Sequence, residues 1–204
     1  MNLLNKVGIM GGTFNPIHFG HLLLAETAFH QFNLDEILIM PTKNPYYKKI
    51  SNSVTEEDRV AMVELAIEDN VHFQLSKEEL NREGTTYTVE TLSHLRVKHP
   101  GYEYYFIMGA DSLFHIETWK DPEIIFSLST LVCAVRDEYD HDDLEKKRIE
   151  LGEKGADIVL LNMPEINISS SDIRKRVGQK LPISSLVPDD VAKYIRQEHL
   201  YEGN

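Results

Sequence analysis

The stretch VGIMGGTFNPIHFGH, residues 7–21, decides the fold of this chain. Its apolar start, residues 7–10, predicts a buried strand, and Gly11 with Gly12 then indicates a tight turn. From about Phe19 the apolar residues recur with the spacing of a helix. A strand, a glycine turn and a helix in this order favour anion binding. Glycines let the backbone approach phosphates closely, and a helix N-terminus presents unpaired N–H groups.

Two histidines in this stretch are candidates to contact the bound phosphates. His18 and His21 are three residues apart, so a helical turn would project both rings the same way, and their nitrogens could donate to phosphate oxygens. Neither G-x-G-x-x-G nor the P-loop pattern is present. A metal site is the alternative, but no third ligand of suitable spacing accompanies the pair, so we expect no metal held by the protein.

The remaining chain alternates apolar runs with amphipathic segments. Further strands are expected at about 36–40, 71–75, 104–108, 130–135 and 157–161, and helices at 19–32, 55–66, 87–99, 142–152, 171–177 and 188–198. This alternation predicts an α/β fold with a doubly wound, mainly parallel sheet and helices on both faces. No linker is visible, so we expect one domain over residues 1–204, its C-terminal helical segment (about 168–204) packing on the same core.

Composition excludes several functional classes. The 204 residues carry a formal net charge of −12, which argues against a nucleic-acid-binding surface. No apolar run approaches the ~18 residues of a membrane span, and no secretory signal is evident. The single cysteine, Cys133, lies in an apolar run and is expected to be a buried thiol rather than a nucleophile. One cysteine agrees with a reducing compartment, and we expect a cytoplasmic protein.

A second motif, ISSSDIRKR, occupies residues 168–176. Ser169 with Asp172 three residues later matches a helix capping box, which is the structural alternative. Capping alone does not account for the cations that follow at Arg174, Lys175 and Arg176. Hydroxyls, helix N–H groups and guanidinium together suit a pyrophosphate.

Both motifs resemble those of one enzyme superfamily. Residues 11–21 are similar to the signature of the nucleotidyltransferases with a Thr/His-x-Gly-His motif, and residues 168–174 resemble their second motif, Ile-Ser-Ser-Thr-x-Ile-Arg. Ser171 replaces the usual Thr, and Asn15 stands where many members have Asp, at a position that mainly shapes the turn. The resemblance implies a Rossmann-like fold in which the two motif histidines contact ATP phosphates.

The middle of the chain resembles one branch of that superfamily. REGTTYTVETL, residues 82–92, is similar to a stretch of the bacterial nicotinate-nucleotide adenylyltransferases, as are Gly109-Ala110-Asp111 with Trp119 and the ending LVPDDVAKYIRQEHLY. Lys48 matches a family lysine near the substrate phosphates. Arg136 matches a family arginine, although Asp137 stands where Pro is usual. The resemblance covers nearly the whole chain.

The resemblance assigns residues to three roles. The implied catalytic residues are His18, His21 and Arg174. The implied ATP and phosphate contacts are Gly11, Gly12, Thr13, Phe14, Lys48, Ser169 and Ser170. The implied contacts to a nicotinate nucleotide are Thr86, Tyr87, Gly109, Asp111, Trp119 and Arg136.

The acceptor assignments also make physical sense. A pyridine ring can stack on Trp119, N–H groups around Thr86 and Tyr87 can meet a carboxylate, and Asp111 can accept hydrogen bonds from ribose hydroxyls. For each residue a structural role is the alternative: Trp119 as a large core side chain, and residues 86–88 as the start of a helix.

The implied activity is adenylyl transfer from Mg-ATP to nicotinate mononucleotide, which yields nicotinate adenine dinucleotide and pyrophosphate in NAD biosynthesis. The attacking phosphate is already an anion, so in-line attack needs neither a general base nor a covalent enzyme intermediate. Mg²⁺ is the expected cofactor, held mainly by the ATP phosphates. Nicotinamide mononucleotide or phosphopantetheine as acceptor, or a nucleotide sensor without catalysis, remain alternatives. The expected partners are the two substrates, without nucleic acid or membrane, and self-association stays open.

Overall fold

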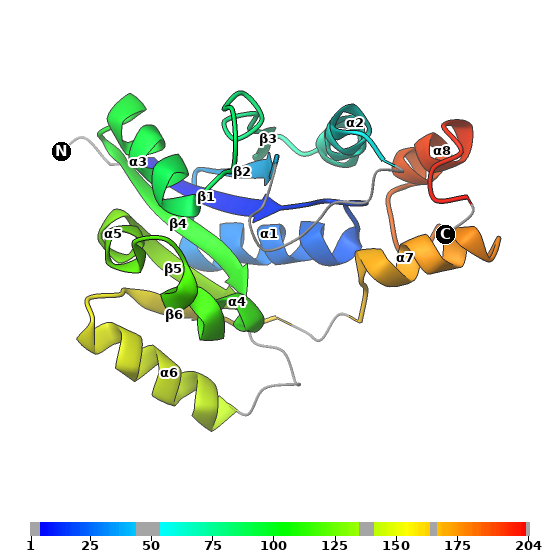
Figure 1. The fold of residues 1–204 in the computed structure, drawn as a ribbon. Helices are drawn as coiled ribbons and strands as arrows, with labels where there is room; N and C mark the ends of the chain where they lie inside the picture. Colours follow the sequence, from blue (N-terminus) through cyan, green and yellow to red (C-terminus); the bar gives the residue numbers. More distant parts are fainter. Residues whose placement is uncertain (1–4, 44–53, 135–140, 164–166, 203–204) are drawn as a thin grey trace.

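The structure is a computed structural model that describes residues 5–43, 54–134, 141–163 and 167–202. These residues form a six-stranded parallel sheet in the order β3-β2-β1-β4-β5-β6, as Figure 1 shows. The predicted doubly wound α/β fold is therefore confirmed. The strands are β1 (Asn5–Gly12), β2 (Glu36–Pro41), β3 (Phe73–Leu75), β4 (Tyr102–Gly109), β5 (Ser129–Ala134) and β6 (Ile158–Leu161).

Helices cover both faces of the sheet and define two apolar cores. On one face pack α1 (Phe19–Phe32), α2 (Glu56–Ile67), α7 (Ser170–Gly178) and α8 (Asp189–Gln197). On the other face pack α3 (Thr88–Lys98), α4 (Ala110–His115), the 3₁₀ helix η1 (Ile116–Thr118), α5 (Pro122–Leu128) and α6 (His141–Glu153). The strands lie between the two cores and show long buried runs, as strands covered on both faces do.

Local sequence signals explain most element boundaries. Helix α1 spans the predicted residues and ends at Asn33, whose left-handed φ of 49° stops the helix. Helix α2 is capped by Thr55, which exchanges hydrogen bonds with Asp58. The strand expected at 71–75 is shorter, because Val71 is 85% exposed and lies before β3.

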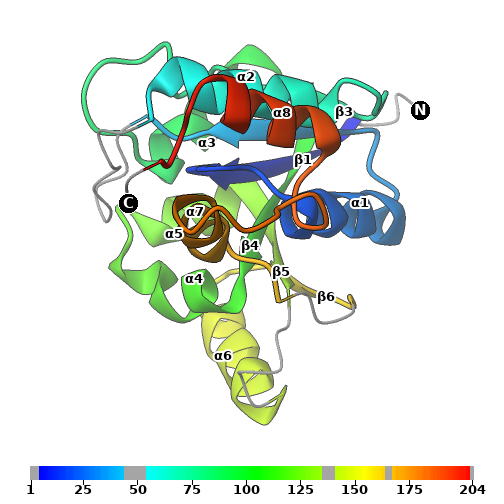
Figure 2. The same ribbon diagram turned by 90° about the vertical axis from the view of Figure 1, so that its right-hand side faces the viewer.

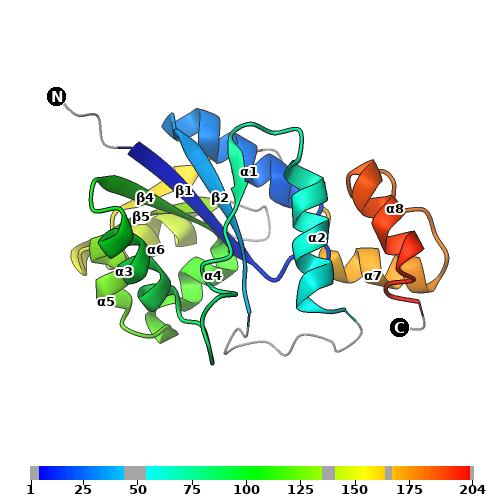
Figure 3. The ribbon, with the colours of Figure 1, turned by 90° about the horizontal axis from the view of Figure 1, so that it is seen from above.

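The C-terminal segment shares a core with the sheet. Figures 1 and 3 show α7 and α8 at the end of the molecule toward which β1 runs, and Figure 2 views the molecule from that end. Ile173 of α7 and Ile195 of α8 are almost fully buried in the core that also contains α1 and α2. Tyr201, beyond α8, is 2% exposed in the same core. Packing therefore holds the C-terminal helices against the carboxyl end of β1.

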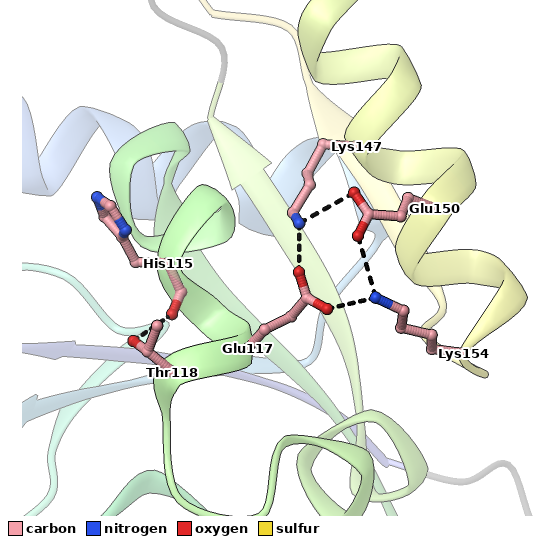
Figure 4. Close-up of polar contacts among 6 residues, drawn as sticks. All are labelled: His115, Glu117, Thr118, Lys147, Glu150 and Lys154. Atoms are coloured by element: carbon pink, nitrogen blue, oxygen red, sulfur yellow. Dashed lines mark hydrogen bonds and ion pairs between the residues drawn. The ribbon is translucent and has the colours of Figure 1, made fainter.

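An ion-pair cluster of Glu117, Lys147, Glu150 and Lys154 joins η1 to α6 (Figure 4). Glu117 accepts hydrogen bonds from both lysines, and Glu150 accepts from Lys147 at 3.1 Å and from Lys154 at 3.0 Å. The two lysines lower the pKa of Glu117 to about 2. The cluster adds a polar attachment to the apolar contacts that α6 makes on its inner face.

Two further expectations concern burial. Cys133 lies in β5 and is fully buried, and burial raises the pKa of its thiol to about 12, so it is a core residue rather than a nucleophile. Among the helices formed by the described residues, none is both long and apolar enough to cross a membrane.

Candidate active site

The topology identifies one edge of the sheet as the place for a ligand. The chain leaves β1 toward β2 on one side, while β4, the other neighbour of β1, leads to β5 on the opposite side. At such a reversal the loops diverge and leave a crevice at the carboxyl ends of the strands. Gly11 and Gly12 end β1, and Gly109 ends β4. Two of the segments predicted to bind substrate therefore meet at the reversal.

A pocket of about 220 Å³ lies at this edge. It brings together five residues predicted from separate parts of the sequence, namely Gly11, His21, Thr86, Gly109 and Trp119. A side-chain carbon added at Gly11 would meet no atom within 4 Å, so the backbone here is open to the pocket. The candidate phosphate segment and the candidate acceptor segments thus face one shared space.

The two histidines are arranged as a stacked pair at the start of α1. Their ring centroids are 3.6 Å apart, with 23° between the planes, so both rings project the same way, as predicted. The backbone N–H of His18 donates to Nδ1 of His21 at 3.3 Å. Because Nδ1 accepts, the neutral His21 ring carries its proton on Nε2. His21 lines the pocket, whereas His18 is 5% exposed and supports it from behind.

Four side chains from distant parts of the chain hold the loop between β1 and α1. Arg59 donates to the Thr13 carbonyl at 2.8 Å, Arg174 to the Asn15 carbonyl at 2.7 Å, and Ser170 to the Pro16 carbonyl at 2.9 Å. The Tyr201 hydroxyl donates to Oδ1 of Asn15 at 2.7 Å. The second motif therefore lies against the first.

These contacts also give the loop its local charge. Arg59 is 2% exposed, and burial lowers the pKa of its guanidinium, yet an arginine remains charged at neutral pH. Arg174 is half-buried, and one of its N–H groups donates to the Asn15 carbonyl. The other N–H groups of the guanidinium can donate to a ligand. Two cations thus flank the loop in a chain whose net charge is −12.

The tight turn depends on Gly12 and Phe14. A side-chain carbon at Gly12 would approach the Phe14 ring to 2.8 Å, and Phe14 is buried in the core and cannot give way. Phe14 also meets the His21 ring edge-on, with centroids 5.1 Å apart. The side chain of Phe14 therefore shapes the loop from the core side. Any contact that Phe14 makes to a phosphate would come from its backbone.

On the acceptor side, Trp119 is half-buried and lines the pocket with Phe106, whose ring meets it edge-on at 6.1 Å. Thr86 is 5% exposed and lies just before Tyr87, the N-cap residue of α3. Lys120 lies over the Tyr87 ring, 4.6 Å from its centroid. Asp111 is exposed in the first turn of α4 and does not line the pocket, whereas Gly109 and Ser112 do.

Three polar atoms in the pocket wall have no hydrogen-bond partner of normal geometry among the described residues. Within the described part of the chain, Thr42 Oγ1, Glu79 Oε2 and Thr86 Oγ1 are buried without a hydrogen bond of normal geometry, and all three residues line the pocket. Buried polar groups in native proteins are nearly always paired. A pocket lined by unpaired oxygens therefore suits a polar ligand that pairs them.

Two predicted site residues lie outside the described residues, and several residues of the site were not predicted from the sequence. Lys48 and Arg136 lie outside the described residues. Ser169 caps α7 by accepting from the Asp172 N–H at 3.0 Å, which is the structural role considered for it. Residues that the sequence did not single out are Thr42, Arg59, Glu79, Thr91 and Tyr201.

Comparisons with known proteins bear on both fold and family. A cytidylyltransferase-like family model matches residues 9–176. A protein of Lachnoclostridium phytofermentans named "Probable nicotinate-nucleotide adenylyltransferase" is 49% identical over 97% of this chain and 100% of its own length. A Desulfitobacterium hafniense protein of the same name is 41% identical over 96% of this chain and 95% of its own.

Among solved structures, the nicotinic acid mononucleotide adenylyltransferase of Plasmodium falciparum complexed with NaAD has a similar fold. The TM-score is 0.81 at 22% identity, and the match covers 98% of both chains. At this identity the likeness concerns the fold alone, which agrees with the strand order described above.

Proposed function

The chain belongs to the nicotinate-nucleotide adenylyltransferase family, and from this premise we propose that its pocket joins ATP and nicotinate mononucleotide in one reaction site. A phosphate oxygen of the mononucleotide attacks the α-phosphorus of ATP. A new P–O bond forms, the bond from the α-phosphorus to the bridging oxygen breaks, and pyrophosphate leaves. The products are nicotinate adenine dinucleotide and pyrophosphate. One observation carries the proposal: a single pocket is lined by Gly11 and His21 and also by Thr86 and Trp119.

The phosphate half of the site stabilises charge. We assign Nε2–H of His21 to the phosphate oxygens, with His18, Arg174 and the N–H groups of the Gly11–Gly12 turn in support. The negative charge shifts onto the leaving pyrophosphate as the bond breaks, and preformed donors stabilise it without reorganising. The attacking phosphate is already an anion, so the scheme uses no general base and no covalent adenylyl-enzyme.

The acceptor half of the site positions the mononucleotide. We assign the pyridine ring to the face of Trp119 and its carboxylate to the N–H groups around Thr86 and Tyr87. Asp111 is assigned to the ribose hydroxyls.

Mg²⁺ belongs to the proposal through ATP. Among the described residues, no group of three or more His, Cys, Asp and Glu side chains is placed to hold a metal ion. The donor set that fits Mg²⁺ is then the phosphate oxygens of ATP, which Mg²⁺ commonly prefers over an all-protein cage. The ion would neutralise part of the phosphate charge.

The acceptor is tested by a panel of substrates. The protein is incubated with Mg-ATP and, in separate reactions, nicotinate mononucleotide, nicotinamide mononucleotide or phosphopantetheine, and pyrophosphate release is measured. We expect the highest kcat/KM with nicotinate mononucleotide. Turnover of phosphopantetheine alone would overturn the acceptor assignment, and release with none of the three would favour a nucleotide sensor.

A further inference from the structure

Glu79 is a buried carboxyl in a polar stretch, residues 76–83, in which Leu80 is the other buried residue. It lies in the turn between β3 and α3, within the polar run SKEELNRE. Lys77 on one side and Asn81 on the other are exposed, whereas Glu79 is 6% exposed and lines the pocket. Acidic side chains are seldom buried without a specific use for the group.

The contacts of Glu79 lead to the start of α3. The Thr91 hydroxyl donates to Oε1 of Glu79 at 3.0 Å, and both groups are buried. Thr86 lies beside the same carboxyl and favours its ionised form, although no hydrogen bond of normal geometry joins Thr86 Oγ1 to Glu79 Oε2. The carboxyl therefore lies between Thr86, which precedes the N-cap residue Tyr87, and Thr91 in the first turn of α3.

The turn that carries Glu79 is itself anchored. Lys43, just after β2, donates from its ammonium group to the carbonyls of Leu80 at 2.8 Å and Arg82 at 2.9 Å. These two bonds hold the backbone on both sides of Asn81. The backbone beside Glu79 is therefore fixed, and the Glu79 carboxyl can hold the start of α3 in position.

Burial also changes the pKa of the Glu79 carboxyl. Desolvation raises the pKa of its carboxyl, while the hydrogen bond from Thr91, the neighbouring Thr86 and the charge of Arg82 act in the opposite direction. The net direction is upward, so burial disfavours the charged form of this carboxyl relative to an exposed glutamate.

We propose that Glu79 is a positioning residue of the acceptor site: its buried carboxyl holds Thr86 and the first turn of α3 in place for the nicotinate group. The inference rests on the proposed function and adds a residue that acts through Thr86 and Thr91. Its hydrogen-bonding capacity, rather than a negative charge, is what the site uses. The ATP half of the pocket is independent of it.

Acceptor binding is measured directly through Trp119, the only tryptophan of the chain. Its fluorescence is titrated with nicotinate mononucleotide in the absence of ATP, and KM for ATP is measured separately. Glu79→Ala leaves the Thr91 hydroxyl with the Tyr87 carbonyl alone as an acceptor and removes the carboxyl beside Thr86. We therefore expect Kd for the mononucleotide to rise roughly tenfold, equivalent to about 1.4 kcal/mol. KM for ATP stays within about twofold, because Gly11 and His21 are untouched.

Two further variants separate positioning from loss of fold. Glu79→Gln keeps the size and the acceptor oxygen, and we expect it to bind the mononucleotide nearly as well as wild type. Thr91→Val keeps the shape and removes the donor to Glu79, and Kd is expected to rise in the same direction as for Glu79→Ala. Glu78→Gln is the matched control, because Glu78 pairs with His94 and Lys98 and does not line the pocket.

The outcomes distinguish this inference from the proposed function. A wild-type protein that turns over nicotinate mononucleotide, with Glu79→Ala binding it equally well, overturns the inference alone. Glu79→Gln losing as much affinity as Glu79→Ala also overturns it, since a negative charge would then be required. A wild-type protein that neither binds nor uses the mononucleotide overturns the proposed function as well.

Discussion

At the scale of single residues, the direction of His21 follows from a backbone contact. The backbone N–H of His18 donates to Nδ1 of His21, so the single ring proton of the neutral His21 lies on Nε2. The ring also stacks on His18 and meets Phe14 edge-on, which limits its rotation. A donor fixed before the substrate arrives is what charge stabilisation at a phosphate requires.

His21→Ala is therefore expected to lower kcat by about 10²–10³-fold, equivalent to ~2.7–4 kcal/mol, by analogy with the loss of one oxyanion-hole donor. The fold should persist, because His21 is only half-buried. Pyrophosphate release gives the rate and a thermal melt gives the stability. His30→Ala, near the other end of α1, is the control and should keep wild-type rates. An unchanged rate for His21→Ala would remove this histidine from the mechanism.

Tyr201 is the residue that fixes the side chain of Asn15. Tyr201→Phe removes the donor and leaves a buried amide oxygen unpaired. We expect the free energy of unfolding to fall by about 1–3 kcal/mol, as measured by urea denaturation. A variant as stable as wild type would mean that the Asn15 oxygen finds another partner.

Sequence reasoning at this scale reached residues with local signatures and missed those with distant partners. The histidine pair and the Ser169 cap were readable because both depend on spacing within one helical turn. Arg59 and Tyr201 act on the loop across 46 and 186 residues of sequence, respectively. Glu79 lies in a charged stretch of sequence, so its burial could not be predicted from the sequence and is visible only in the folded structure.

At the scale of elements, periodicity predicted the long helices and the strands well. It did not predict α4, η1 or α5, because helices of 6, 3 and 7 residues are too short to show a helical period. These short helices carry Trp119 to the pocket wall. The sequence therefore predicted the candidate acceptor residues, but it did not predict the short helices that bring Trp119 to the pocket.

The ion-pair cluster of Glu117, Lys147, Glu150 and Lys154 makes a pH-dependent prediction for α6. The pKa of Glu117 is about 2 in the folded protein and 4.5 ordinarily, so its ionised form favours folding. This stabilisation is fully present above about pH 4.5 and is lost as the pH falls through about 2. Urea denaturation should show Glu117→Gln less stable than wild type at pH 7.

The difference between the two proteins should shrink as the pH falls from 4.5 toward 2. Added salt should shrink it too, because Glu117, Glu150 and Lys154 are partly exposed to solvent. Asp143→Asn is the control, since Asp143 pairs with Lys146 inside α6 and not with η1. A stability difference that stays constant across this pH range would contradict the cluster's role.

At the scale of the whole molecule, the reversal of strand order beside β1 determines where chemistry takes place. The carboxyl ends of β1 and β4 leave a crevice, and side chains of α7 together with Tyr201, which follows α8, hold the loop beside it. Arg59 and Arg174 flank the loop, and the acidic side chains of Glu56 and Glu57 lie near Arg59. We propose that residues 1–204 form one domain because the C-terminal helices share the core of the sheet.

One domain should unfold in one step. Ile195→Ala, in the buried face of α8, is expected to cost about 2–5 kcal/mol. Trp119 fluorescence, which reports on the opposite face of the sheet, and far-UV circular dichroism should give coincident urea transitions, in wild type and variant alike. A separate early transition seen by circular dichroism alone would show that the C-terminal helices fold independently.

The central claim is direct transfer between two substrates held in one pocket. The most direct test uses ATP made chiral at the α-phosphorus by one sulfur, with nicotinate mononucleotide as acceptor, and determines the configuration of the dinucleotide product. A single in-line displacement predicts that the thio-dinucleotide forms with inverted configuration. Retained configuration would mean two displacements through an adenylyl-enzyme and would contradict the account.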